Sequence, residues 1–381
     1  MSRSAQGSGT IRQRKDGRWE ARYTVGHDPS TGKQIQKSIY GKTQGEVSKK
    51  LRQMCKEVDD GTYKEPVKYT LKDWAEIWLS DYTSSLKPLT LKQYTSYTNN
   101  HIVKKIGNVK LIRLDAPTIQ RFYNALGAEG LTPKTIKNIH GILHSMLETA
   151  AEVGYIKNNP TSVCKLPKVE RKPIKPLESP DIIKFLEAKK GDRYETIFLV
   201  DLFTGLRQSE ILGLTWDCID FENGTLLVYR QLQKNNGKYY FSSLKNGKSR
   251  VVPLAPSIVQ VFKKQKALQA EQQLKSYGLW DNADNLIFTD AQGKHLTHSN
   301  LYKHFKKIVE SIGIPDARFH DLRHSYAVTS LQSGNDVKTV QEALGHHTAA
   351  FTLDVYGHVT EQMRKESAAR LEGFIQNIKP I

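Results

Sequence analysis

Residues 204–214 read Thr-Gly-Leu-Arg-Gln-Ser-Glu-Ile-Leu-Gly-Leu, and residues 320–324 read His-Asp-Leu-Arg-His. Between them Lys245 lies beside an Asn-Gly turn signal, and beyond them come Leu-Gly-His at 344–346 and then Tyr356. Each motif alone is weak evidence of function, because one arginine in a basic chain is usually a surface charge and one tyrosine is usually a core residue. Their order along the chain decides how the C-terminal half is interpreted.

The residue types in this series suit the transfer of a phosphoryl group. Negative charge develops on the non-bridging oxygens, and the planar forks of Arg207 and Arg323 match those oxygens better than point charges do. His320 lies three residues before Arg323 at an expected helix start, so both project from one face, where His320 can accept a proton or bond the phosphate. A phenol with a pKa of about 10 needs such help to act as a nucleophile. The series therefore predicts that Tyr356 attacks a phosphate.

Other catalytic motifs are missing from the sequence. It contains no P-loop, no GxGxxG after a strand, no HExxH and no GxSxG, so nucleotide, zinc and serine hydrolysis lose their usual support. Cys55, Cys164 and Cys218 have no metal-binding spacing, and the first residues contain no apolar signal segment. We therefore expect a cytoplasmic protein that needs neither a metal nor a cofactor and does not associate with a membrane.

In its order and spacing the series resembles the tyrosine recombinases, also called phage-type integrases. The resemblance covers the whole C-terminal unit. It implies that Lys245 protonates the leaving 5′-oxygen as a general acid, with Lys248 as the open alternative. It implies that His346 contacts a phosphate oxygen and that Glu210 orients the arginines. It also implies a 3′-phosphotyrosyl intermediate, a Holliday junction and a homotetramer on double-stranded DNA.

The charge balance points to a polyanion as partner. The chain of 381 residues has 57 Lys and Arg against 39 Asp and Glu, a formal net charge of +18. Residues 1–64 and 65–173 each carry a net charge of +7, whereas residues 174–381 carry only +4. Neutralised phosphates release counterions, so the first two segments suit DNA. The alternative is a basic surface kept for solubility.

The chain is expected to be mainly helical, with small β-sheets and several domains. Residues 1–64 predict a three-stranded sheet and a helix, with a turn at Asp16-Gly17 and a capping box formed by Thr43 and Glu46. Basic and aromatic side chains alternate on this sheet, so one face can enter a DNA groove, unless it is only the polar face of an amphipathic sheet. The basic candidates are Arg12, Arg14, Arg18 and Arg22.

Residues 66–165 predict a helical domain. A helix capped by Thr70 carries Trp74 and Trp78 on its apolar side, and further helices are expected over 90–103, 116–126 and 135–153. Outward lysines are candidates for phosphate contacts, although a solvated face explains each of them singly. These are Lys87, Lys92, Lys134 and Lys137.

A linker and a mixed α+β catalytic domain follow. Residues 166–180 are rich in Lys and Pro and have too few apolar residues to pack, so they predict a spacer that can also track a duplex. Residues 181–381 begin with helices over 181–189 and 196–203. Three strands follow at 225–231, 239–243 and 249–254, with Asn246-Gly247 as the turn of a hairpin that carries Lys245.

The resemblance gives these segments roles. Residues 1–64 resemble the arm-type DNA-binding domain of phage and conjugative-transposon integrases, and 66–165 resemble the core-binding domain. This layout implies integration and excision of a mobile element, helped by an excisionase and a DNA-bending host factor. A helix over 363–378 either covers its own domain or is donated to a neighbouring protomer. The rival functions are a type IB topoisomerase-like relaxer and a non-catalytic DNA-binding regulator.

Overall fold

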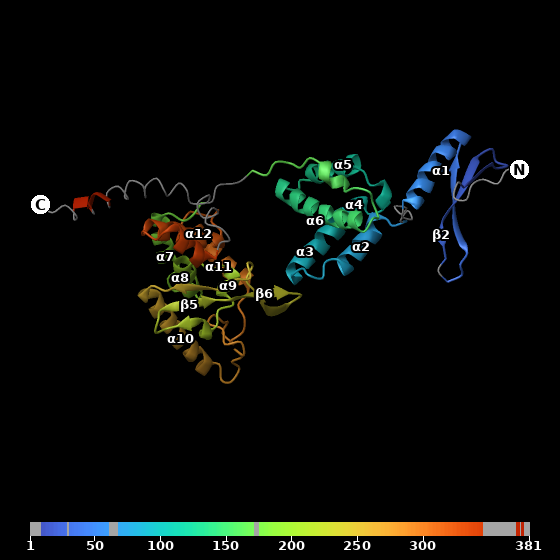
Figure 1. Ribbon diagram of the computed structural model, residues 1–381. Helices are drawn as coiled ribbons and strands as arrows, with labels where there is room; N and C mark the ends of the chain where they lie inside the picture. The colour runs from blue at the N-terminus through green and yellow to red at the C-terminus, as the bar shows by residue number, and fades with distance from the viewer. Residues whose placement is uncertain are drawn as a thin grey trace. The chain divides into compact units, whose positions relative to one another are not determined.

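The computed structural model describes residues 9–28, 30–60, 68–170, 175–345, 371–373 and 375–376. The chain is mainly helical with small antiparallel sheets, as its sequence predicts. It divides into two compact units, Met1–Glu170 and Arg171–Ile381 (Figure 1). Within the described ranges, no helix has the length and apolar character needed to cross a membrane.

The N-terminal part is the expected sheet with one helix. Strands β1 (Thr10–Gln13), β2 (Trp19–His27) and β3 (Gln34–Gly41) are antiparallel in that order, and α1 spans Gln44–Asp59. A small core joins the sheet to the helix; its buried members are Ala21, Tyr23, Val47 and Leu51. Thr43 caps α1 as predicted, by accepting a bond from the Glu46 amide. The capping box is incomplete, because the Glu46 carboxylate accepts from the Lys42 amide instead.

The rest of the first unit is helical. Its elements are α2 (Leu71–Asp81), α3 (Pro88–Tyr97), the π-helical η1 (Thr98–Val103), α4 (Lys104–Ile106), the 3₁₀ turn η2 (Leu111–Arg113), α5 (Ala116–Ala128), α6 (Pro133–Glu152) and the 3₁₀ turn η3 (Pro160–Val163). The predicted helix over 90–103 is therefore α3 continued by a π-helical segment. Trp74 is fully buried, and its ring NH donates to the Met146 carbonyl at 2.9 Å. Both tryptophans belong to the core that the helical spacing predicts.

The second unit surrounds its largest core with helices and two small sheets. The helices are α7 (Ser179–Ala188), α8 (Glu195–Thr204), α9 (Gln208–Ile211), the 3₁₀ turn η4 (Trp216–Cys218), α10 (Pro256–Lys275), α11 (His298–Ser311), α12 (Phe319–Gln332) and α13 (Val337–Leu344). The strands are β4 (Ile219–Asp220), β5 (Thr225–Val228), β6 (Arg230–Asn235), β7 (Lys238–Ser243) and β8 (Arg250–Pro253).

The strands pair differently from the prediction. One sheet has the order β4-β5-β8, and β6 pairs only with β7, so the predicted strand 225–231 is two strands in two sheets. The hairpin turn lies at residues 236–237, between β6 and β7. The turn at 246–247 exists, since the Gly247 amide bonds the Leu244 carbonyl at 3.0 Å, but it connects strands of different sheets. Lys245 is therefore not at the tip of a hairpin.

The end of the predicted linker is packed, which corrects the expectation that residues 166–180 make no core contact. Leu177 is only 4% exposed and belongs to the main core of the second unit. Its amide also donates to the Ser325 hydroxyl on α12 at 2.8 Å. One apolar side chain and one backbone hydrogen bond thus attach the end of this segment to the second unit, and composition averaged over a window hides both.

Candidate active site

A glycine turn places the first arginine. Helix α8 ends at Thr204, and Gly205 follows with φ +61°, in the left-handed region. A Cβ at this position would lie 2.4 Å from Cδ1 of Tyr326 and 2.8 Å from Cδ2 of Leu344. Glycine is therefore needed for both the conformation and the space. The turn delivers Arg207 to the N-terminus of α9.

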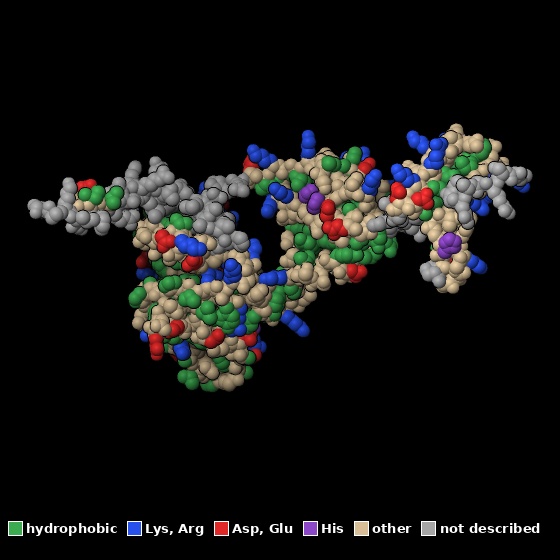
Figure 2. All heavy atoms as spheres, in the orientation of Figure 1, with side chains coloured by type: hydrophobic (Ala, Val, Ile, Leu, Met, Phe, Trp, Pro, Cys, Tyr) green, Lys and Arg blue, Asp and Glu red, His purple; other side chains and the backbone are tan. Residues whose placement is uncertain are grey.

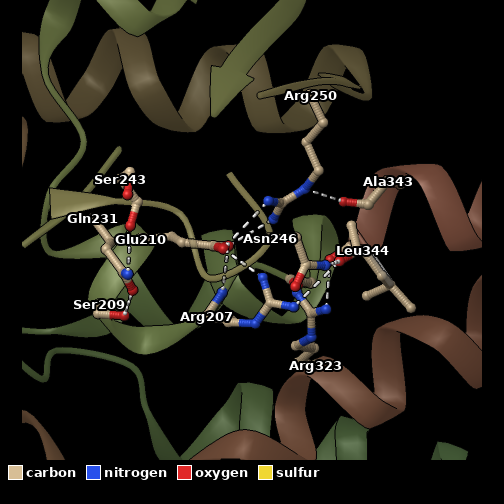
Figure 3. A network of polar contacts seen from close by, with 12 residues as sticks. Arg207, Ser209, Glu210, Gln231, Ser243, Asn246, Arg250, Arg323, Ala343 and Leu344 are labelled. Carbon is tan, nitrogen blue, oxygen red and sulfur yellow. Dashed lines mark hydrogen bonds and ion pairs between the residues drawn. The ribbon is translucent and has the colours of Figure 1, made fainter. Parts of the chain in front are cut away.

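The Glu210 carboxylate joins two arginines (Figure 3). It is 1% exposed, and its Oε1 lies 2.6 Å from Nη1 of Arg207 while its Oε2 lies 2.6 Å from Nη2 of Arg250. The Arg207 amide also donates to Oε2 at 3.0 Å. Burial alone would raise the pKa of this carboxyl, but the hydrogen bond and charge of Arg250 and the charge of Arg207 outweigh it and lower the pKa to about 2. Glu210 is therefore a carboxylate at neutral pH.

Arg323 lies in the interior beside this pair. It comes from α12 and is 1% exposed, with Nη1 donating to the Gly205 carbonyl at 2.6 Å and Nη2 to the Leu344 carbonyl at 2.5 Å. Burial, and then the positive charge of Arg207, lower the pKa of Arg323 to about 9. The guanidinium therefore keeps its charge at neutral pH, and two backbone carbonyls hold it in place.

Two histidines lie against each other in the first turns of α12. The rings of His320 and His324 meet edge to face with centroids 4.8 Å apart, and His324 lies behind with 7% exposure. His320 itself reaches the surface, but the groups packed around its ring desolvate it, and this desolvation, followed by the charges of Arg323 and Arg207, lowers the pKa of His320 below its usual value. A lowered pKa favours the neutral imidazole, which has a nitrogen lone pair that can accept a proton.

Backbone carbonyls at the C-terminal end of α13 accept hydrogen bonds from the three arginines of the site. The Ala343 carbonyl accepts from Nε of Arg250 at 2.6 Å, and the Gly345 carbonyl accepts from Nη2 of Arg207 at 3.3 Å. Together with the Leu344 bond to Arg323, the last carbonyls of one helix hold three guanidinium groups. Cations are favoured there, because the carbonyl end of a helix carries partial negative charge. The resulting cluster of positive charges is suited to binding an anion.

Comparison with known proteins identifies the family. The model described as "Phage integrase family" matches residues 173–363, which is half of the chain, and "Phage integrase, N-terminal SAM-like domain" matches residues 70–127. The "Tyrosine recombinase XerC-like" protein of Caldanaerobacter subterraneus subsp. tengcongensis is 33% identical over 370 residues, which cover 91% of this chain and 94% of that protein. The chain belongs to the phage integrase family. It is a tyrosine-type site-specific recombinase.

Solved structures of integrases share the fold. The Tn1549 transposon integrase in complex with transposon right end DNA is 22% identical, with a TM-score of 0.67 over 80% of this chain and 99% of that chain. A lambda integrase tetramer bound to a Holliday junction is 19% identical, with a TM-score of 0.56 over 89% of this chain and 96% of that chain.

The integrase residues expected from sequence are only partly described by the structure. Arg207, Glu210, Arg323 and His320 converge in one place. Lys245 and Lys248, the two candidates for the acid, lie on one exposed turn. His346 and Tyr356 lie outside the described residues, as does most of the segment 363–378.

The DNA-binding candidates are all exposed. Arg12 and Arg22 lie on strands of the N-terminal sheet and hydrogen-bond the buried Glu20, whereas Arg14 and Arg18 lie in the turn between β1 and β2, not on the sheet as expected. The four lysines of the helical part are exposed as well. Figure 2 shows Lys and Arg side chains projecting from many points of the first unit, and no single stripe stands out on the visible face.

Sequence reasoning missed three polar residues of this integrase site. Arg250 shares Glu210, and Asn246 donates to the Gly345 carbonyl at 3.0 Å. Asp201 on α8 is fully buried, with both carboxyl oxygens lacking a hydrogen-bond partner among the described residues. Burial raises its pKa well above the usual range. Only the position of Asn246 and Arg250 beside the predicted Lys245 turn could have drawn attention to them.

Proposed function

We propose that this recombinase integrates and excises a mobile element, with Tyr356 as the nucleophile. The tyrosine oxygen attacks a DNA phosphodiester, forming a 3′-phosphotyrosyl bond and releasing a 5′-hydroxyl. That hydroxyl of one duplex then attacks the phosphotyrosine of the other, so each broken phosphodiester is replaced by a new one without ATP. Two such exchanges, with a Holliday junction between them, complete recombination.

The observation that carries the proposal is the convergence of Arg207 and Arg323 beside Glu210. Their guanidinium groups come from different elements, and the same α13 turn holds both. A paired guanidinium site of this kind stabilises the negative charge that develops on a phosphate under attack. We assign proton acceptance or phosphate bonding to His320, phosphate contact to His346 and leaving-group protonation to Lys245 or Lys248.

We further propose double-stranded DNA as the partner and a homotetramer as the active assembly. One structural neighbour is bound to transposon end DNA, and another is a tetramer on a Holliday junction. Residues 1–64 would bind arm sites, residues 66–165 core sites, and 181–381 would carry the chemistry, with 166–180 between them. An excisionase and a DNA-bending host factor would assist. The likeness to a transposon integrase, together with the N-terminal sheet, favours integration over topoisomerase-like relaxation.

A suicide DNA substrate tests the chemistry. The substrate is a nicked duplex that carries the junction sequence flanking the element, and denaturing electrophoresis detects a protein–DNA adduct. We expect an adduct from the intact chain and from Tyr302→Phe, a control that alters an exposed tyrosine on α11, and none from Tyr356→Phe. DNA binding without any adduct from the intact chain would support the regulator instead. Product mapping separates recombination between two sites from relaxation.

A further inference from the structure

Arg250 is hydrogen-bonded to two other parts of the site, the Glu210 carboxylate and the end of α13. Its side chain, at the start of β8, is 8% exposed. Nη2 donates to Oε2 of Glu210 at 2.6 Å, Nη1 to Oε1 at 3.3 Å, and Nε to the Ala343 carbonyl at 2.6 Å. All three nitrogens are therefore directed at protein acceptors, two of them at the Glu210 carboxylate and one at the end of α13.

The shared carboxylate links Arg250 to Arg207. Glu210 has one negative charge and two guanidinium partners, and the Arg207 side chain is the more open of the two, at 23% exposure. Without Arg250, the buried carboxylate would depend on Arg207 alone, and its charge would cancel that of Arg207 in a region of low dielectric constant. With Arg250 present, the three groups together keep one positive charge, available at the more open guanidinium.

Arg250 also supports the turn that leads toward the nucleophile in the sequence. Gly345 has φ +62°, and a Cβ there would lie 3.1 Å from Cδ and 3.2 Å from Nη1 of Arg250. The guanidinium therefore lies directly against this turn. The neighbouring Leu344 carbonyl holds Arg323, and His346 is the next residue after Gly345. Arg250 thus connects Glu210, the α13 turn and both phosphate-binding arginines.

We propose that Arg250 is a positioning residue of the recombinase, which fixes Glu210 and the last turn of α13 so that Arg207 meets the phosphate with its charge available. The inference rests on the proposed function, because it assigns Arg207 to the scissile phosphate. It predicts a defect in the chemical step of strand cleavage, whereas DNA binding, which depends on many exposed basic groups, stays nearly unchanged.

The test compares full-length variants on the suicide substrate described above. The single-turnover rate of adduct formation is measured at saturating DNA, the adduct amplitude gives the active fraction, and gel shift gives the dissociation constant. For Arg250→Met we expect a rate per active molecule lowered about 10- to 100-fold, as is usual when a residue that orients a ligand is lost. Its DNA affinity should stay within about threefold, well below the tenfold that 1.4 kcal/mol would give. Arg250→Lys should recover part of the rate, because lysine keeps the charge but cannot bridge both acceptors.

A matched control and a double variant separate positioning from mere stability. Arg230→Met removes an arginine of the same unit that donates to Thr215 Oγ1 at 2.8 Å instead of to Glu210, so its rate per active molecule should equal that of the intact chain. Glu210→Gln should also slow the reaction, and adding Arg250→Met to it should cost little more, since both act through one contact.

Each remaining outcome counts against a particular claim. Rates per active molecule equal to that of the intact chain in both Arg250→Met and Arg250→Lys would overturn the positioning role. It would also be overturned if the rate reductions of Glu210→Gln and Arg250→Met multiplied in the double variant. If Arg250→Met does not fold, Arg250→Lys is the test. A rate below that of the intact chain supports the positioning role, and an equal rate overturns it. Absence of an adduct from the intact chain would instead refute the proposed function itself.

Discussion

Replacing Gly205 by alanine tests how closely the site depends on one turn. A Cβ at φ +61° costs about 1–2 kcal/mol in backbone strain. The same carbon would lie 2.4 Å from the Tyr326 ring and 2.8 Å from the Leu344 side chain, so both must move, and overpacking of this kind costs about 1–3 kcal/mol. The sum is roughly 2–5 kcal/mol, and a value of about 3 kcal/mol lowers the melting temperature of a unit of this size by about 6–12 °C.

The variant should also react more slowly than its stability explains. The Gly205 and Leu344 carbonyls both hold Arg323, so displacing the turn moves that guanidinium. Differential scanning calorimetry and single-turnover adduct formation measure the two effects. Gly191→Ala is the control, because Gly191 has φ +76° with nothing within 4 Å of its added Cβ and therefore reports strain alone. A Gly205→Ala melting temperature no lower than that of the control would refute the reasoning.

Three further outcomes follow from the described contacts. The folded pKa of Glu210, about 2 against a usual 4.5, supplies stability that is present above pH 4.5 and lost as the pH falls toward 2. Urea unfolding should therefore show Glu210→Gln less stable than the intact chain by about 3 kcal/mol at pH 7, with the gap closing below pH 4.5; a constant gap would contradict the assignment. Asn246→Ala releases the turn that carries Lys245 from the Gly345 carbonyl, so the adduct rate should fall while DNA affinity holds, and an unchanged rate would deny the turn that role. Arg18→Gln should reduce the slope of log affinity against log salt by about 1 on arm-site DNA, as expected for one lost phosphate contact, and an equal slope would remove Arg18 from the interface.

The sequence predicts well whatever depends on neighbours in the chain. Thr43 and Thr70 cap their helices as expected, because a capping residue and its amide partner lie three positions apart. The apolar stripe with Trp74 and Trp78 is buried for the same local reason. The arginine motifs were found from their order along the chain and their resemblance to the tyrosine recombinases, and the helix start expected at His320 is the start of α12.

Local sequence patterns do not predict which distant segments contact each other. The run 225–231 is apolar enough for one strand, yet it divides between two sheets, because pairing partners are chosen in three dimensions. Lys245 was consequently expected on a hairpin that does not exist. Arg250 looked like one basic residue among many, since its partners, Glu210 and Ala343, lie 40 and 93 positions away.

The choice of partners for the three arginines explains how the site can be both rigid and cationic. Ion pairs with three carboxylates would hold the guanidinium groups firmly but would cancel the charge that a phosphate needs. Among the residues that the structure describes, Glu210 is the only carboxylate bonded to the cluster, and neutral carbonyls of Gly205 and the α13 turn make the other contacts. Asp201 lies nearby, but burial favours its uncharged form. Two positive charges therefore remain uncompensated before DNA arrives, and an attacking phenolate or a charged phosphate would supply the balance.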